Sequence, residues 1–97
     1  MQKEFSHEPD ADRYVLRLGD EIASVLDYRL LGDAIAMTRA FTNPRLRGSG
    51  LAGELVAFAV DDVESTSSRH VVPSCWYVAE WFDRHPERTA LLRPRTA

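Results

Sequence analysis

RLRGSGLAG, residues 45–53, is the stretch from which the fold of this chain can be predicted. Residues 43–49 are rich in turn formers and lack apolar periodicity, so we expect a loop there. A helix is predicted to follow as far as about Ser65, because apolar residues recur at every fourth position, at Leu51, Leu55, Ala59 and Val63. A loop that opens a helix presents free backbone N–H groups at the positive end of the helix dipole. The stretch therefore predicts a site for an anion such as phosphate.

Upstream of this loop, the sequence predicts three strands. Apolar and polar residues alternate over residues 13–18, 21–30 and 34–42, and Gly-Asp pairs at 19–20 and 32–33 separate these runs. Alternation with a period of two indicates strands, and short glycine turns between strands are typical of hairpins. Three consecutive strands of this kind predict an antiparallel meander.

Downstream of the first helix, the sequence predicts one more strand and one more helix. Residues 69–74 contain a short apolar run that predicts a buried strand, and residues 76–85 have helical spacing that must end before Pro86. A helix between the third and fourth strands implies a right-handed crossover that joins a parallel pair. The predicted fold class is α/β (α+β), a mixed sheet in which the antiparallel meander is followed by a helix, a parallel strand and a helix.

Length and composition indicate one soluble domain. The chain has 97 residues, 44% of them hydrophobic and 28% charged, and no apolar run long enough to cross a membrane. We expect a single domain over residues 1–97, with its core at about 13–92, no signal peptide and a cytoplasmic location. Cys75 is the only cysteine, which excludes an internal disulfide and a four-cysteine zinc site. The spacing of the three histidines gives no reason to expect a metal site either.

The charge distribution favours a small anionic ligand over nucleic acid. The formal net charge is -3, and the basic residues are scattered along the chain rather than gathered into one strip. Arg45 and Arg47 nevertheless stand close together in the glycine-containing loop. We expect neither nucleic acid nor a membrane as a partner, and the oligomeric state cannot be predicted from these residues.

Other interpretations of the glycine loop are weaker. Residues 48–53 match the G-x-G-x-x-G string of dinucleotide-binding folds, but such a fold needs the loop after its first strand and an acid after the next strand. This chain has Pro-Ser-Cys at 73–75 instead of that acid. A nucleoside triphosphate loop needs Lys followed by Ser or Thr, which is missing. A purely structural turn stays open as an alternative.

The motifs resemble those of a known family. RGSGLA at 47–52 resembles the Arg/Gln-x-x-Gly-x-Gly/Ala loop of the GNAT-superfamily acetyltransferases, which also lies between a strand and a helix. VPSCWYV at 72–78 and RHPE at 84–87 resemble the second signature of the very short, cysteine- and glycine-containing branch of that superfamily. The resemblance covers residues 13–92 approximately. It implies an N-acetyltransferase that uses acetyl-coenzyme A (acetyl-CoA) and acetylates an amine, either a small molecule or a protein lysine.

The resemblance also implies which residues hold the cofactor. The backbone of Phe41 and Thr42, at the end of the third predicted strand, is expected to pair with the pantetheine arm. His85 is expected to touch the adenosine end. The diphosphate is expected to bind to the loop, at Arg47, Gly48, Ser49, Gly50, Leu51 and Ala52.

Catalysis is expected to proceed by direct attack of the amine on the thioester, with proximity supplying much of the rate. A free N–H near Phe41 or Thr42 would polarise the carbonyl. Cys75 and Tyr77 are the candidate catalytic residues, Cys75 as proton donor or nucleophile and Tyr77 as an acid, although each is also a plausible core residue. Larger members of the superfamily often carry a tyrosine that acts as the general acid, at the position where this chain has Phe82. A non-catalytic coenzyme A-binding or protein-interaction module, and a nucleotide-binding protein, therefore stay open as alternatives.

Overall fold

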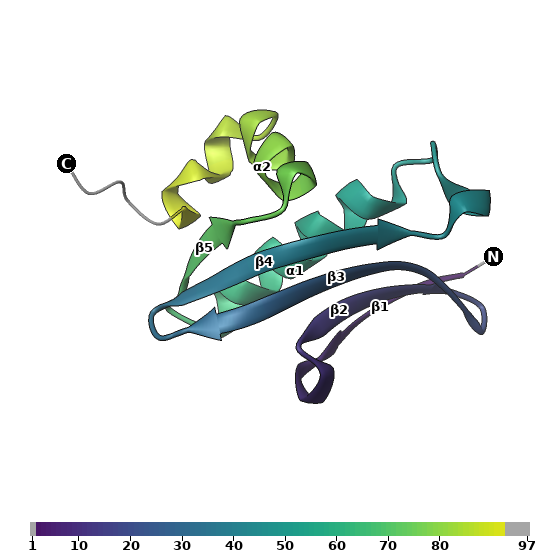
Figure 1. Ribbon diagram of the computed structural model, residues 1–97, viewed down its shortest axis with the longest axis horizontal. Coiled ribbons are helices and arrows are strands. Elements are labelled where there is room, and N and C mark those ends of the chain that lie inside the picture. The colour runs from purple at the N-terminus through teal and green to yellow at the C-terminus, as the bar shows by residue number, and fades with distance from the viewer. Residues whose placement is uncertain (1, 93–97) are drawn as a thin grey trace.

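The computed structural model describes residues 2–92, which form a single five-stranded sheet with two α-helices packed against it (Figure 1). The strands and helices in chain order are β1 (Lys3–Glu8), β2 (Arg13–Leu18), β3 (Glu21–Leu31), β4 (Ala34–Thr42), α1 (Leu51–Thr66), β5 (His70–Pro73) and α2 (Trp76–Asp83). Short 3-10 helices occupy Pro9–Ala11, Pro44–Leu46 and Pro86–Leu91. Neither α-helix in this part of the chain has the length and apolar character needed to cross a membrane.

The strands lie in the order in which they occur in the chain. β1 to β4 are antiparallel neighbours, and β5 lies parallel to β4 after the crossover through α1. The predicted mixed α/β class is therefore confirmed. The antiparallel part has four strands, where the sequence predicted three, because β1 pairs with β2 over its whole length.

β1 gave no usable signal in the sequence. Its residues are KEFSHE, with Phe5 as the one large apolar side chain. β1 lies at the edge of the sheet and exposes much of its surface, so it needs few apolar residues. Phe5 stacks on Phe58 of α1 with the ring centroids 5.3 Å apart. Aromatic contacts of Phe5 and His7, the ion pair from Lys3 to Glu54 and a full ladder of backbone pairs hold this strand, and none of these leaves a periodic pattern.

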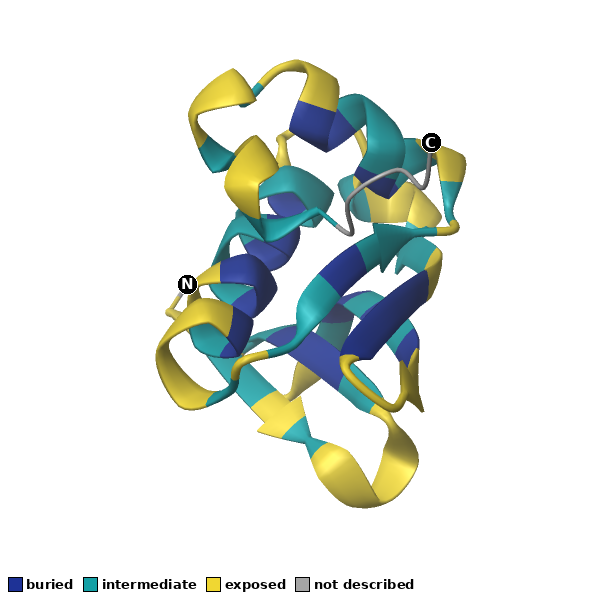
Figure 2. Ribbon diagram, turned by 90° about the vertical axis from the view of Figure 1, so that its left-hand side faces the viewer, coloured by how far each residue is buried: buried dark blue, intermediate teal, exposed yellow. Residues whose placement is uncertain are grey.

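The core lies between the sheet and α1. Figure 2 shows the buried side of α1 turned toward the sheet. The predicted apolar stripe of the helix is confirmed, since the buried α1 residues are Leu51, Leu55, Val56, Ala59, Val60 and Val63. α2 joins the same core through Val78, Trp81 and Phe82. It ends at Asp83, two residues before the predicted end. His85, which precedes Pro86, has left the helical conformation, with φ -129° and ψ 64°.

β4 and β5 run together for only part of their length. β5 pairs with Ala34 to Met37 of β4, and after Pro73 the chain leaves the sheet. The N–H of Cys75 donates to the carbonyl of Met37 at 2.9 Å, and α2 then begins. β4 continues to Thr42 without a strand on that side in residues 2–92. The second half of β4 is therefore left with a free backbone edge beside the start of α2.

Candidate active site

The loop before α1 has the predicted free amides. Gly50 is the N-cap residue with φ 78°, and Gly48 has φ 90°, conformations that favour glycine. The first hydrogen bond of the helix runs from the N–H of Glu54 to the carbonyl of Gly50 at 3.1 Å, and no side chain caps this end. Within residues 2–92, the N–H groups of residues 48–53 have no hydrogen-bond partner. They are available to an anion.

A cleft of about 560 Å³ lies where these amides meet the end of β4 and the start of α2. It is lined by Ala40, Phe41, Thr42, Leu46, Arg47, Gly48, Gly50, Leu51, Ala52, Trp76 and Tyr77. The cleft therefore brings together seven of the predicted cofactor residues with one predicted catalytic residue, Tyr77. Ser49 does not line it, because its hydroxyl donates to the carbonyl of Leu46 at 2.8 Å within the loop.

The free backbone edge of β4 faces this cleft. The N–H of Asn43 donates to the carbonyl of Ala23 at 2.8 Å, so Asn43 faces β3. Backbone groups in an antiparallel pair alternate, so Phe41 also faces β3, while Ala40 and Thr42 direct their N–H and C=O groups to the other side. The carbonyl of Phe41 accepts a further hydrogen bond from the Ser24 hydroxyl at 2.8 Å. The backbone groups that face the cleft are therefore those of Ala40 and Thr42, whereas the sequence suggested those of Phe41 and Thr42.

Positive charge dominates the cleft. Arg47 is the one charged residue that lines it, and Arg47 has no ion-pair partner in the described part of the chain. Arg45 is occupied by an ion pair with Glu21. The acid in the first turn of α1, Glu54, is held by Lys3 of β1 at 2.9 Å. The unpredicted strand therefore neutralises the carboxylate that would otherwise repel an anion at the helix N-terminus.

Tyr77 lies with its hydroxyl against the first turn of α1. Its oxygen is 3.4 Å from the position that a Cβ on Gly53 would occupy. Burial raises the pKa of the Tyr77 phenol above its ordinary value, so the hydroxyl stays protonated and able to donate a hydrogen bond at neutral pH. This places a hydrogen-bond donor beside the free amides.

Neither Cys75 nor Phe82 lines the cleft. Cys75 is half-buried against the core and is the N-cap residue of α2, but it is not among the residues that line the cleft. Phe82 is only 2% exposed and packs edge-on against Trp81 in the core. The position of the tyrosine acid of larger relatives is thus a core position in this chain.

His85 lines a second cleft instead of the first. This cleft of about 320 Å³ lies between α1 and α2 and includes Glu54, Tyr77, Trp81 and His85. The His85 ring stacks on Trp81 with the centroids 4.0 Å apart, and its Nδ1 lies 2.7 Å from the Trp81 carbonyl oxygen. Tyr77 lines both clefts, so the two adjoin at that residue.

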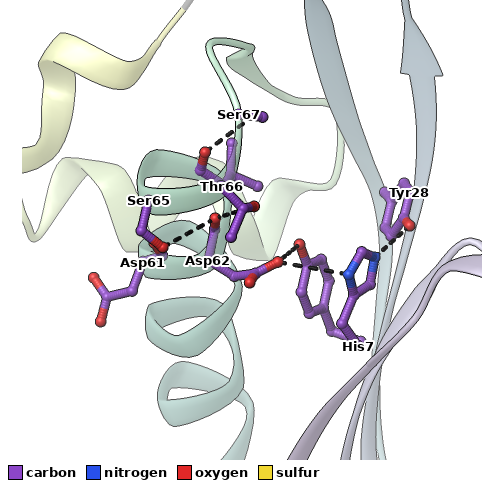
Figure 3. Close-up of polar contacts among 9 residues, drawn as sticks. His7, Tyr28, Asp61, Asp62, Ser65, Thr66 and Ser67 are labelled. Atoms are coloured by element: carbon purple, nitrogen blue, oxygen red, sulfur yellow. Dashed lines mark hydrogen bonds and ion pairs between the residues drawn. The ribbon is translucent and has the colours of Figure 1, made fainter.

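A polar cluster lies toward the other end of α1. Figure 3 shows His7 between Asp62 and Tyr28, with its Nε2 2.6 Å from the Tyr28 hydroxyl and its Nδ1 3.6 Å from Asp62. The buried Tyr14 donates to Asp62 at 2.7 Å, and burial together with this carboxylate raises the Tyr14 pKa. The polar groups of this cluster have partners within the protein. No group of three or more potential metal ligands is found in residues 2–92.

Comparison with known proteins identifies a family over most of the chain. The model of a family described as GCN5-related N-acetyltransferase matches residues 13–91, from the start of β2 to the last 3-10 helix. The match includes the loop, the free edge of β4 and the start of α2. No curated protein matches the chain.

Proposed function

This chain belongs to the GCN5-related N-acetyltransferase family, and from that premise we propose that it transfers an acetyl group from acetyl-CoA to an amine. The observation that carries the proposal is the row of free amides at residues 48–53, which opens into the same cleft as the free edge of β4. Diphosphate needs N–H donors and positive charge, and an extended amide-containing arm needs a strand edge. The chain offers both within one cleft.

We assign the diphosphate of acetyl-CoA to the amides of residues 48–53, with the guanidinium of Arg47 beside it. The protonated hydroxyl of Tyr77 supplies a further donor at the same end. The pantetheine arm pairs with the N–H and C=O groups of Ala40 and Thr42. The adenosine lies in the second cleft, where the stacked rings of Trp81 and His85 offer an aromatic surface.

Acetyl-CoA supplies an activated thioester, so the protein needs mainly to hold and orient it. In the proposed reaction the N–H of Ala40 or Thr42 donates to the carbonyl oxygen as negative charge develops there. For the proton that the departing thiolate needs, we propose the thiol of Cys75. Cys75 does not line the cleft, but it directly precedes Trp76, which does, and its N–H is bonded to the Met37 carbonyl of β4. The Cys75→Ala and Cys75→Ser pair tests this role. Loss of turnover with unchanged acetyl-CoA binding supports it, and unchanged turnover in both variants removes Cys75 from the chemistry.

The acceptor is an amine, and the open cleft admits either a small molecule or an exposed lysine of a protein. Titration calorimetry with acetyl-CoA at tens of micromolar tests the cofactor assignment, and competition with ATP separates coenzyme A recognition from general nucleotide binding. Absence of heat from acetyl-CoA binding would contradict the proposal.

A binding module without catalysis is the second candidate function, favoured by the burial of Phe82 in place of an acidic tyrosine. Release of free coenzyme A in the presence of a set of amines distinguishes the two. A binding module would still show the heat of acetyl-CoA binding but would release no free coenzyme A.

A further inference from the structure

The surroundings of the cleft are unsuited to a positively charged acceptor. Arg47, the one charged residue lining it, is a cation and is assigned above to the diphosphate of the cofactor. Three carboxylates on the elements around it are already paired: Glu21 with Arg45, Glu54 with Lys3, and Glu80 with Arg84. An ammonium group entering here would find none of these three carboxylates unpaired.

Alkyl amines carry this disadvantage at neutral pH. An alkylamine resembles the lysine side chain, with a pKa of about 10.4, so roughly one molecule in 2,500 is neutral at pH 7. An enzyme that acetylates such an amine needs a base to take its proton and benefits from a carboxylate to attract the cation. The lining of this cleft supplies neither, since it contains no Asp, Glu or His.

Trp76 adds a flat apolar surface at the same place. It is the first residue of α2, follows Cys75 directly, lines the cleft, and exposes 74% of its surface. An exposed indole at the rim of a cleft is suited to stack against an aromatic ring. Tyr77, whose ring lies edge-on to it at 5.8 Å, supports one side of the indole and leaves the rest open.

We propose that the acceptor is an aromatic amine, held against Trp76. This inference rests on the proposed acetyl transfer and narrows its acceptor. An aromatic amine is neutral at pH 7 because its nitrogen lone pair is delocalised into the ring, so neither a base nor a carboxylate is needed to prepare it. Its nitrogen forms a bond to the thioester carbonyl carbon, the carbon–sulfur bond breaks, Cys75 gives its thiol proton to the departing sulfur, and the proton lost by the nitrogen restores the Cys75 thiol. The products are an N-aryl acetamide and free coenzyme A.

Three acceptors test the proposal on the full chain with saturating acetyl-CoA at pH 7. Aniline is neutral and aromatic, cyclohexylamine has a ring of similar size but is cationic and aliphatic, and trifluoroethylamine is weakly basic but not aromatic. The acetylated product of each is measured by chromatography. We expect kcat/KM for aniline to exceed that for cyclohexylamine by at least about tenfold, and KM for trifluoroethylamine to exceed that for aniline.

Variants at Trp76 separate the ring from the charge. Trp76→Leu is expected to raise KM for aniline by about three- to tenfold, and Trp76→Phe by less, with the Kd of acetyl-CoA unchanged by calorimetry. Leu31→Ala, at an exposed apolar residue outside the cleft, is the control and should change neither constant. Equal or better use of cyclohexylamine, equal KM for trifluoroethylamine and aniline, or an unchanged aniline KM in Trp76→Leu would each overturn the inference while leaving acetyl transfer intact. Failure of acetyl-CoA to bind, or of any amine to be acetylated, would instead contradict the proposed function and this inference with it.

Discussion

Near the C-terminal end of α1, Asp62 accepts a hydrogen bond from Tyr14 and lies beside His7, whose other nitrogen meets Tyr28. At the N-terminal end of the same helix, the amides of residues 48–53 have no partner in the described chain. Buried polar groups in folded proteins are almost always satisfied, so groups with internal partners indicate structure, and unpaired donors grouped in a cleft indicate a place for a ligand. The difference predicts that changes at the first end alter stability, and changes at the second end alter binding.

Removal of the Asp62 carboxylate is expected to have the largest effect. Asp62→Ala leaves the buried Tyr14 hydroxyl without its acceptor and removes the carboxylate beside His7. We expect the free energy of unfolding to fall by about 3 kcal/mol, measured by urea denaturation, because unsatisfied buried donors are costly. Binding of acetyl-CoA by the folded fraction should be unchanged.

The neighbouring residue Asp61 provides the control for this variant. Its carboxylate is 67% exposed and pairs with Arg88 at the surface. Asp61→Ala should cost less than about 1 kcal/mol, as exposed ion pairs do. Equal losses in the two variants would show that the cluster at Asp62 has no special structural role.

Removal of the Arg47 guanidinium is expected to act on binding alone. Arg47→Ala should weaken acetyl-CoA binding about thirtyfold, or roughly 2 kcal/mol, because a charge-assisted contact to the diphosphate is lost. The melting temperature without ligand should stay the same, since Arg47 has no ion-pair partner in residues 2–92. Arg45→Ala, which removes the ion pair with Glu21 in the same loop, is the matched comparison. A similar loss of affinity in both variants would argue for a diffuse electrostatic effect rather than a contact at Arg47.

The two ends also differ in how far they could be predicted from sequence. The loop and the helix after it leave local signals, because glycines, turn formers and a four-residue apolar period all depend on near neighbours. The strands over 13–18 and 34–42 were predicted for the same reason, and their bounds are confirmed. The cluster around Asp62 was missed. It joins His7, Tyr14, Tyr28 and Asp62 from four separate elements, and no spacing in the chain indicates that they meet.

Two features at or beside the cleft could not be predicted from the sequence. The backbone role of Ala40 depends on a β-bulge between β3 and β4 at Asp27 and Tyr28, which changes the side to which later residues point. The ion pair from Lys3 to Glu54 joins residues 51 apart in the chain. Such features follow from strand register and tertiary packing, which composition and periodicity do not encode.

The alkaline stability of the cluster should depend on Tyr14. The folded state holds the Tyr14 pKa above its ordinary value near 10, whereas the unfolded chain has the ordinary value. The contribution of Tyr14 is therefore complete below about pH 10 and is lost as the pH rises further, by at most about 1.4 kcal/mol per pH unit. Between about pH 9 and 11, which is roughly one unit either side of the ordinary tyrosine pKa, the free energy of unfolding should fall less steeply in Tyr14→Phe than in the unchanged protein. Urea denaturation at each pH measures it. Parallel curves for the two proteins would contradict the assignment.

Tyr77 tests the N-terminal end with a smaller change. Tyr77→Phe removes only the hydroxyl that lies beside the first turn of α1. We expect acetyl-CoA to bind about fivefold more weakly, a loss of roughly 1 kcal/mol, with kcat nearly unchanged. A large fall in kcat at constant affinity would instead return Tyr77 to the role of an acid. Titration calorimetry and steady-state kinetics on the same preparation distinguish these results.

The smallest expected effect lies where stability and binding meet, at Gly53 in the first turn of α1. Alanine favours a helix over glycine by about 0.5–1 kcal/mol, and the added Cβ would meet the Tyr77 hydroxyl at 3.4 Å, an ordinary contact distance. Gly53→Ala should therefore raise the free energy of unfolding by about that amount in urea denaturation. Acetyl-CoA affinity should stay within about twofold, because the amide of residue 53 is retained and the methyl group adds no charge. Weaker binding together with higher stability would mean that the bound diphosphate touches the Cα of Gly53, so that a methyl group there displaces it.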